Sequence, residues 1–140
     1  MKKVLFICIH NSARSQMAEA YLNRLGEGKF SAESAGLEKG VLNPFAVEAM
    51  KEVGYDISKN STDSVFDFHK EGRVYDIVIK VCDAMNGQRC PIFPGNHVTL
   101  NWDLQDPSSL AGDDASKLQR TREIRDQIEV KVKALIETYS

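Results

Sequence analysis

The sequence predicts a single α/β domain over residues 1–140, in which an open, mainly parallel four-stranded sheet carries helices on both faces. Two observations lead to this fold class. Runs rich in β-branched residues alternate along the chain with segments of helical apolar spacing. Parallel strands need such helical crossovers between them. In addition, no internal repeat, low-complexity tract or linker divides the chain, and 140 residues are enough for one hydrophobic core.

The first strand, loop and helix are predicted from residues 2–25. An apolar run ends at Cys8, and five residues separate that cysteine from Arg14. A helix follows, which Gly26 or Gly28 can end. Its apolar face consists of Met17, Ala18, Tyr21, Leu22 and Leu25.

The middle of the chain predicts a second strand and two helices. Residues 30–34 read as a short strand that ends at Ala35-Gly36. Asn43 is a favourable N-cap and Pro44 suits the first turn of the helix that follows, with Gly54 as its C-cap. Residues 65–68 predict a further short helix.

The second half predicts two strands and a long helix. Residues 75–82 are rich in β-branched residues, and residues 97–102 alternate between apolar and polar. Residues 113–139 have the spacing of an amphipathic helix, for which Asp113 or Asp114 supplies the cap. Since ligands bind beyond the carboxyl ends of parallel strands, residues at those ends are candidates for a common site.

Composition favours an ordinary globular protein of the cytoplasm. Hydrophobic residues make up 42% and charged residues 27% of the chain, and no apolar run is long enough for a membrane span or a secretory signal. A formal charge of −2 does not favour binding to nucleic acid or anionic lipid. Three cysteines indicate free thiols in a reducing compartment. We therefore expect a monomer whose partner is a small molecule or another protein.

The loop between the first strand and helix is the strongest candidate site. Backbone N–H groups of the loop and of the first helical turn converge above Cys8, which suits a tetrahedral oxyanion and favours thiolate over thiol. Arg14 can hold two oxygens of the anion, and Ser15 can donate to the sulfur. The alternative is a buried strand-end cysteine beside an ordinary arginine. The predicted oxyanion-binding residues are Cys8, Ile9, His10, Asn11, Ser12, Ala13, Arg14 and Ser15.

A second pair of thiols, Cys82 and Cys90, lies at the ends of one glycine-containing loop. Such a loop can close into a disulfide without a large entropic penalty. Two unrelated cysteines are the alternative, and zinc is disfavoured because the pair lacks the usual ligand spacing. We expect a redox role, in which an oxidation at Cys8 passes to this pair by thiol–disulfide exchange.

Asp106 is a candidate general acid. Because Pro107 restricts the residue before it to extended conformations, the Asp106 carboxyl would be held in a defined direction, where it could give a proton to a leaving oxygen. The alternative is a common Asp-Pro turn.

Taken together, the motifs resemble those of a known family. The segment 8–20 resembles the anion-binding loop and first helix of the low-molecular-weight protein tyrosine phosphatase fold. Within that fold the chain resembles the thioredoxin-coupled arsenate reductases, and the likeness extends over nearly its whole length. The loop motif is specific to the fold, whereas the pair Cys82 and Cys90 distinguishes the reductases from the phosphatases.

The resemblance implies a three-thiol relay. Cys8 would attack the arsenic of bound arsenate, with Arg14 stabilising the oxyanion and Asp106 protonating the leaving oxygen. Cys82 would then attack Cys8 and release arsenite, and Cys90 would move the disulfide to a Cys82–Cys90 pair that thioredoxin reduces. Phosphate or sulfate would bind as analogues. No cofactor is required.

The resemblance also implies a potassium ion beside the loop in some members. The matching positions are Asn11, Glu19, Ser34, Ser61 and Asp63, with a serine where a threonine is usual.

Three departures from the family pattern and three rival functions stand beside this interpretation. Seven residues separate the paired cysteines, one more than usual, position 13 is alanine where cysteine is frequent, and His10 replaces a frequent glycine.

The first rival function is a phosphatase that uses Cys8 alone through a phosphocysteine, although Ser108 and Ser109 stand where such phosphatases usually have tyrosines. The others are a binding module without turnover and a reductase coupled to a small thiol.

Overall fold

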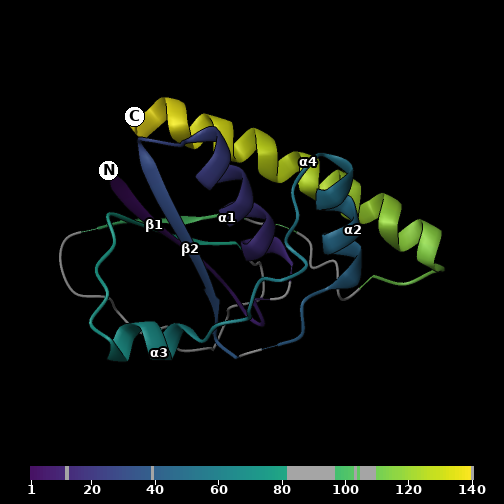
Figure 1. Ribbon diagram of the computed structural model, residues 1–140, viewed down its shortest axis with the longest axis horizontal. Helices are drawn as coiled ribbons and strands as arrows, with labels where there is room; N and C mark the ends of the chain where they lie inside the picture. Colours follow the sequence, from purple (N-terminus) through teal and green to yellow (C-terminus); the bar gives the residue numbers. More distant parts are fainter. Residues whose placement is uncertain (12, 39, 82–96, 103, 105–109, 140) are drawn as a thin grey trace.

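Strands and helices alternate along the chain in the computed structural model, which describes all residues except 12, 39, 82–96, 103, 105–109 and 140 (Figure 1). This order agrees with the predicted one. The elements are β1 (Lys2–Cys8), α1 (Arg14–Leu25), β2 (Phe30–Gly36), α2 (Pro44–Glu52), α3 (Val65–Lys70), β3 (Ile77–Lys80), β4 (Val98–Asn101) and α4 (Asp114–Tyr139).

The described strands form one sheet with the order β2-β1-β3-β4, and every pair of neighbours is parallel. This confirms the predicted fold class. The register pairs Cys8 with Gly36 and Ile7 with Lys80, so β1, β2 and β3 end at the same edge of the sheet. Lys80 in turn pairs with Asn101 at the end of β4. That edge is where a parallel sheet binds its ligands.

The two faces of the sheet bury different side chains of β1. Val4, Phe6 and Cys8 face a core shared with α1, α2 and α4, whereas Leu5 and Ile7 face a smaller core that includes residues of α3. In Figure 1 α3 accordingly lies on the opposite side of the sheet from α1 and α4. Burial on both faces explains why β1 is a continuous apolar run without alternation.

Two of the predicted helix starts are confirmed in detail. The Asn43 side chain accepts from the N–H groups of Phe45 and Ala46 at 2.8 and 3.3 Å, and Pro44 occupies the first turn of α2. Asp113, just before α4, accepts from the Ser116 N–H at 2.8 Å. Of the two candidates, Asp113 is therefore the residue that caps α4.

The two C-terminal strands are shorter than predicted. The residues on either side of β3 still bond to β1, since the Asp76 N–H donates to the Lys3 carbonyl and the Val81 N–H to the Ile7 carbonyl. Only Ile77–Lys80, however, keep the ladder. β4 is an edge strand with exposed residues, so only part of the predicted 97–102 run is paired. No helix within the described ranges is long and apolar enough to cross a membrane.

Candidate functional site

Cys8 ends β1 with its thiol enclosed by hydrogen-bond donors. The residue is 2% exposed, and its Sγ accepts from the backbone N–H of Asn11 at 3.1 Å. The hydroxyl Oγ of Ser15, in the first turn of α1, lies 3.1 Å from the same sulfur. Donors directed at a buried sulfur stabilise its negatively charged form, so the surroundings of Cys8 suit a nucleophile.

The backbone of Asn11 turns the loop back over the sulfur. Its φ of 55° lies in the left-handed region, which asparagine tolerates better than most residues. The loop also needs a glycine on the neighbouring strand, because a Cβ at Gly36 would lie 2.7 Å from the Asn11 nitrogen and 2.8 Å from the His10 carbonyl carbon. The end of β2 therefore shapes the loop as much as the end of β1 does.

The Asn11 side chain determines which way the Ser15 hydroxyl points. The backbone N–H of Asp63 can only donate, so the Asn11 atom 2.9 Å from it is the oxygen Oδ1. The other end of the amide, Nδ2, then donates to Ser15 Oγ at 2.8 Å. Because Ser15 already accepts from Asn11, its own proton is left to donate to Cys8.

Arg14 lies at the same edge of the sheet and is 3% exposed. Its Nη1 donates to the Leu104 carbonyl at 2.9 Å, which ties the guanidinium to the chain just beyond β4. The first turn of α1 contains no acidic residue, and Ala13 provides no side-chain cap for its N–H groups. A guanidinium beside an uncapped helix start can hold a tetrahedral oxyanion against Cys8.

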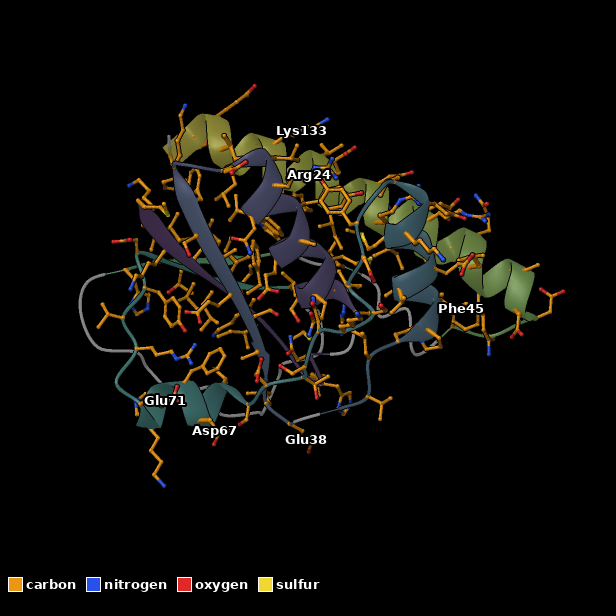
Figure 2. All side chains as sticks on the ribbon, viewed as in Figure 1. Arg24, Glu38, Phe45, Asp67, Glu71 and Lys133 are labelled. Atoms are coloured by element: carbon orange, nitrogen blue, oxygen red, sulfur yellow. The ribbon has the colours of Figure 1, made fainter. Side chains whose placement is uncertain are left out.

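His10 is accommodated by a close contact with the segment after β2. A Cβ at Gly40 would lie 2.7 Å from the Cβ of His10, and the Gly40 N–H donates to the His10 carbonyl at 3.0 Å. The imidazole is half exposed, and its Nδ1 is 3.6 Å from a carboxylate oxygen of Glu38. In Figure 2 Glu38 lies just beyond the tip of β2, at the sheet edge where the loop is found. The departure at position 10 is thus compatible with the loop.

The residues matched to a potassium site are brought together beside this loop. Ser34 Oγ donates to Glu19 at 3.2 Å, Ser61 Oγ lies 3.4 Å from a carboxylate oxygen of Asp63, and Asp63 N–H donates to Asn11. Burial raises the pKa of Glu19 to about 7, and the charge of Asp63 adds to this shift. Within the described ranges no three His, Cys, Asp or Glu side chains group as transition-metal ligands would.

Several predicted site residues cannot be placed. Ser12, Cys82, Cys90 and Asp106 lie outside the described residues. The proximity expected among the thiols, and between the thiols and the acid, therefore stays a prediction.

Sequence reasoning missed the structural role of two residues that shape the loop. Gly36 admits the Asn11 backbone, and the buried side chain of Gln16 contacts both Asn11 and the segment before α3. A signal for Gln16 was present, because a long polar side chain stands beside the apolar face of α1 at the start of that helix. Its partners are far away in the chain, so no spacing rule could identify them.

Comparison with known proteins supports the resemblance. Residues 3–140 match the model of the family described as low molecular weight phosphotyrosine protein phosphatase. The arsenate reductase of Staphylococcus aureus (strain N315) is 42% identical over 134 residues, which cover 94% of this chain and 93% of that protein. The glutaredoxin arsenate reductase of Synechocystis sp. is 38% identical over 136 residues, with 97% of each chain covered.

Solved structures agree with the relatives. A structure described as an arsenate reductase in the phosphate binding state superposes with a TM-score of 0.83 at 38% identity, and each chain is covered completely. The thioredoxin-dependent arsenate reductase of Corynebacterium glutamicum gives a TM-score of 0.75 at 29% identity over 99% of this chain and 62% of that one. The predicted resemblance to arsenate reductases of this family is thus confirmed over nearly the whole sequence.

Proposed function

Because this chain belongs to the low molecular weight phosphotyrosine protein phosphatase family, we propose that it is an arsenate reductase recycled by thioredoxin. One observation carries the proposal most directly. The buried sulfur of Cys8 faces the Asn11 N–H and the Ser15 hydroxyl, at the N-terminus of α1, whose first turn contains Arg14. A thiolate in that position can attack the central atom of a bound oxyanion.

In the first step Cys8 Sγ forms a bond to arsenic. A bond from arsenic to one oxygen breaks, and that oxygen leaves as water after it takes a proton from Asp106. Arg14 and the first-turn N–H groups of α1 stabilise the charge on the remaining oxygens, since they are fixed before the reaction begins. The product of this step is a Cys8 thioester of arsenate, still at oxidation state five.

In the second step electrons move from sulfur to arsenic. Cys82 attacks Cys8, a disulfide forms between them, and the bonding pair of the sulfur–arsenic bond goes to arsenic, which leaves as arsenite. Cys90 then attacks Cys82 and frees Cys8. Thioredoxin reduces the resulting Cys82–Cys90 disulfide. This relay is supported by the resemblance and by the presence of two cysteines that phosphatase chemistry does not need.

The substrate class is a tetrahedral oxyanion, and phosphate should compete with arsenate. A related structure is described as an arsenate reductase in the phosphate binding state, which supports this expectation. A tyrosine phosphatase acting through a Cys8 phosphocysteine is the second candidate, because the family description is that of a phosphatase. A relative named glutaredoxin arsenate reductase makes a glutaredoxin-linked donor the alternative to thioredoxin.

The described residues also fit a monovalent cation such as potassium. The five residues present oxygen atoms in two hydrogen-bonded groups, Ser34 with Glu19 and Ser61 with Asp63 and Asn11, and the charge of Asp63 acts on Glu19. Burial raises the pKa of Glu19, and a cation bound beside it would stabilise the ionised form. Such an ion would hold Asn11, and through it the loop.

The experiment that tests the function is arsenate-dependent consumption of NADPH with thioredoxin and thioredoxin reductase. We expect the parent protein to turn over and both Cys82→Ser and Cys90→Ser to lose turnover. The two variants should keep slow hydrolysis of an aryl phosphate, because that reaction needs only the Cys8 loop. If arsenate drives no consumption while all three proteins hydrolyse phosphotyrosine equally fast, the protein is a phosphatase and the proposal is wrong.

A further inference from the structure

We propose that Gln16 is a positioning residue for the nucleophile, because its amide holds Asn11 in the orientation that directs two donors at Cys8. This inference rests on the proposed role of Cys8, and it adds a residue that the proposed function does not use. The side-chain amide of Gln16 bonds to Asn11, Ser61 and Asn60 and not to the sulfur of Cys8. It acts through Asn11.

The side chain of Gln16 is buried, and both ends of its amide are hydrogen-bonded. The residue is 1% exposed, and its Nε2 lies 3.2 Å from the Asn11 carbonyl oxygen, 3.2 Å from Asn11 Oδ1 and 2.9 Å from the Ser61 carbonyl oxygen. A backbone carbonyl can only accept, so the atom facing Ser61 is the nitrogen. The other end of the amide, Oε1, accepts from Asn60 Nδ2 at 3.1 Å.

The contacts of Gln16 continue into the donors around the sulfur. Gln16 and the Asp63 N–H both donate to Asn11 Oδ1, which leaves Asn11 Nδ2 facing Ser15. Ser15 in turn keeps its proton for Cys8. Because Gln16 Nε2 has two protons, one goes to the Ser61 carbonyl and the other is shared between Asn11 Oδ1 and the Asn11 backbone carbonyl. The contact to the carbonyl restrains the left-handed residue whose N–H is the second donor to the sulfur.

Only a side chain with a donor can do this at position 16. The three oxygen atoms facing Nε2 are acceptors, and an apolar side chain of equal length would leave buried oxygens with fewer donors. Asn11 is fully buried, so water has little access to replace the amide. We therefore expect the loop to relax and the donors to Cys8 to weaken when Gln16 is replaced by methionine.

The test measures how fast Cys8 is alkylated in the reduced, full-length protein. Iodoacetamide at neutral pH is the probe, the modified residue is identified by peptide mass spectrometry, and protection by inorganic phosphate shows that the reacting thiol lies in the anion loop. Gln16→Met should slow alkylation of Cys8 about tenfold, since the Asn11 N–H and the Ser15 hydroxyl would no longer be held toward the sulfur. Asn60→Ala, an exposed change that removes only the contact to Gln16 Oε1, should slow it about twofold to threefold.

Asn23→Ala is the matched control. Asn23 also lies on α1 and bonds through its side-chain amide to the backbone of β2, with Nδ2 3.1 Å from the Ala32 oxygen and Oδ1 2.8 Å from the Ala32 nitrogen. This variant removes two bonds between the α1 side chain and the backbone of β2 but should alkylate Cys8 within about twofold of the parent. Melting temperatures of all variants show whether stability alone explains the rates.

Two results would overturn the inference. One is a parental alkylation rate in Gln16→Met, and the other is an equal slowing in Asn23→Ala. If Gln16→Met does not fold, the decision falls to Asn60→Ala, and a parental rate there overturns the inference. The NADPH assay separates this outcome from the proposed function, because a parent that fails to reduce arsenate can still show the effect of Gln16 on Cys8.

Discussion

At the scale of single residues, the site depends on hydrogen bonds whose direction is imposed by the backbone. The Asp63 N–H and the Ser61 carbonyl determine how the amides of Asn11 and Gln16 are turned, and the amide of Asn11 determines the direction of the Ser15 hydroxyl. The electrostatics at Cys8 therefore come from the segment between α2 and α3 as well as from the loop itself.

Glu19 gives a prediction about pH. Burial raises its pKa from 4.5 to about 7, so the folded protein favours the neutral acid. Between these two values the folded state binds more protons than the unfolded state, and this residue lowers stability as pH rises until the penalty is complete above about 7. Glu19→Gln should remove that slope and stabilise the protein at pH about 8 by roughly 1–3 kcal/mol.

Urea unfolding of the parent and Glu19→Gln across this pH range measures the effect, and repeating it in potassium chloride against choline chloride tests the cation. Potassium should stabilise the parent more at the alkaline end, where Glu19 is ionised, and should have little specific effect on Glu19→Gln. Parallel stability curves for the two proteins would contradict the assignment of the pH dependence to Glu19.

The residues that sequence could predict here are those whose chemistry follows from local spacing. Cys8, Arg14 and Ser15 stand at the end of a strand and the start of a helix, so their common location follows from the order of the elements. The roles of Gln16 and Gly36 were not predicted, because they depend on close approaches between segments that are distant in the sequence. Such contacts are decided by packing, for which one sequence holds no direct signal.

At the scale of elements, α4 is joined to α2 by a charged cluster. Glu52, at the end of α2, accepts from Arg122 Nη2 at 2.6 Å and from Arg125 Nη1 at 3.0 Å. The same Arg125 atom donates to the Ala49 carbonyl at 2.9 Å. The Arg125 side chain is 10% exposed, so its bonds are shielded from solvent more than those of an ordinary surface pair.

Arg125→Ala should therefore destabilise the protein by about 1–3 kcal/mol, because it leaves a buried carbonyl without its donor. The matched control is Arg120→Ala, which breaks an exposed pair with Glu123 on the same helix and should change stability by less than about 0.5 kcal/mol. Chemical denaturation measures both variants. Equal stability losses in the two variants would show that burial of the Arg125 hydrogen bonds does not explain their contribution to stability.

The lengths of the strands show why element boundaries were less predictable than element types. Residues 75–81 are rich in β-branched residues, yet among them only Ile77–Lys80 pair with β1 and β4 as a strand. The start of α4, in contrast, was predictable, since Asp113 caps it through a local bond to Ser116. Local chemistry sets caps, whereas pairing with other strands sets strand ends.

At the scale of the whole molecule, the parallel sheet gathers the chemistry at one edge. Cys8 ends β1, Gly36 ends β2, and Leu104 beyond β4 accepts from Arg14. Alternation of strands and helices was enough to predict this arrangement, because parallel strands bring their carboxyl ends to the same side. The relay of thiols that we propose would work at this edge.

A single turnover with Cys90→Ser tests the proposed thiol relay most directly. The reduced variant is mixed with an equimolar amount of arsenate, arsenite is quantified, and disulfides are mapped by peptide mass spectrometry. The proposed relay should give about as much arsenite as protein, together with a Cys8–Cys82 disulfide that cannot pass on to position 90. No arsenite, with Cys8 and Cys82 both recovered as free thiols, would contradict it.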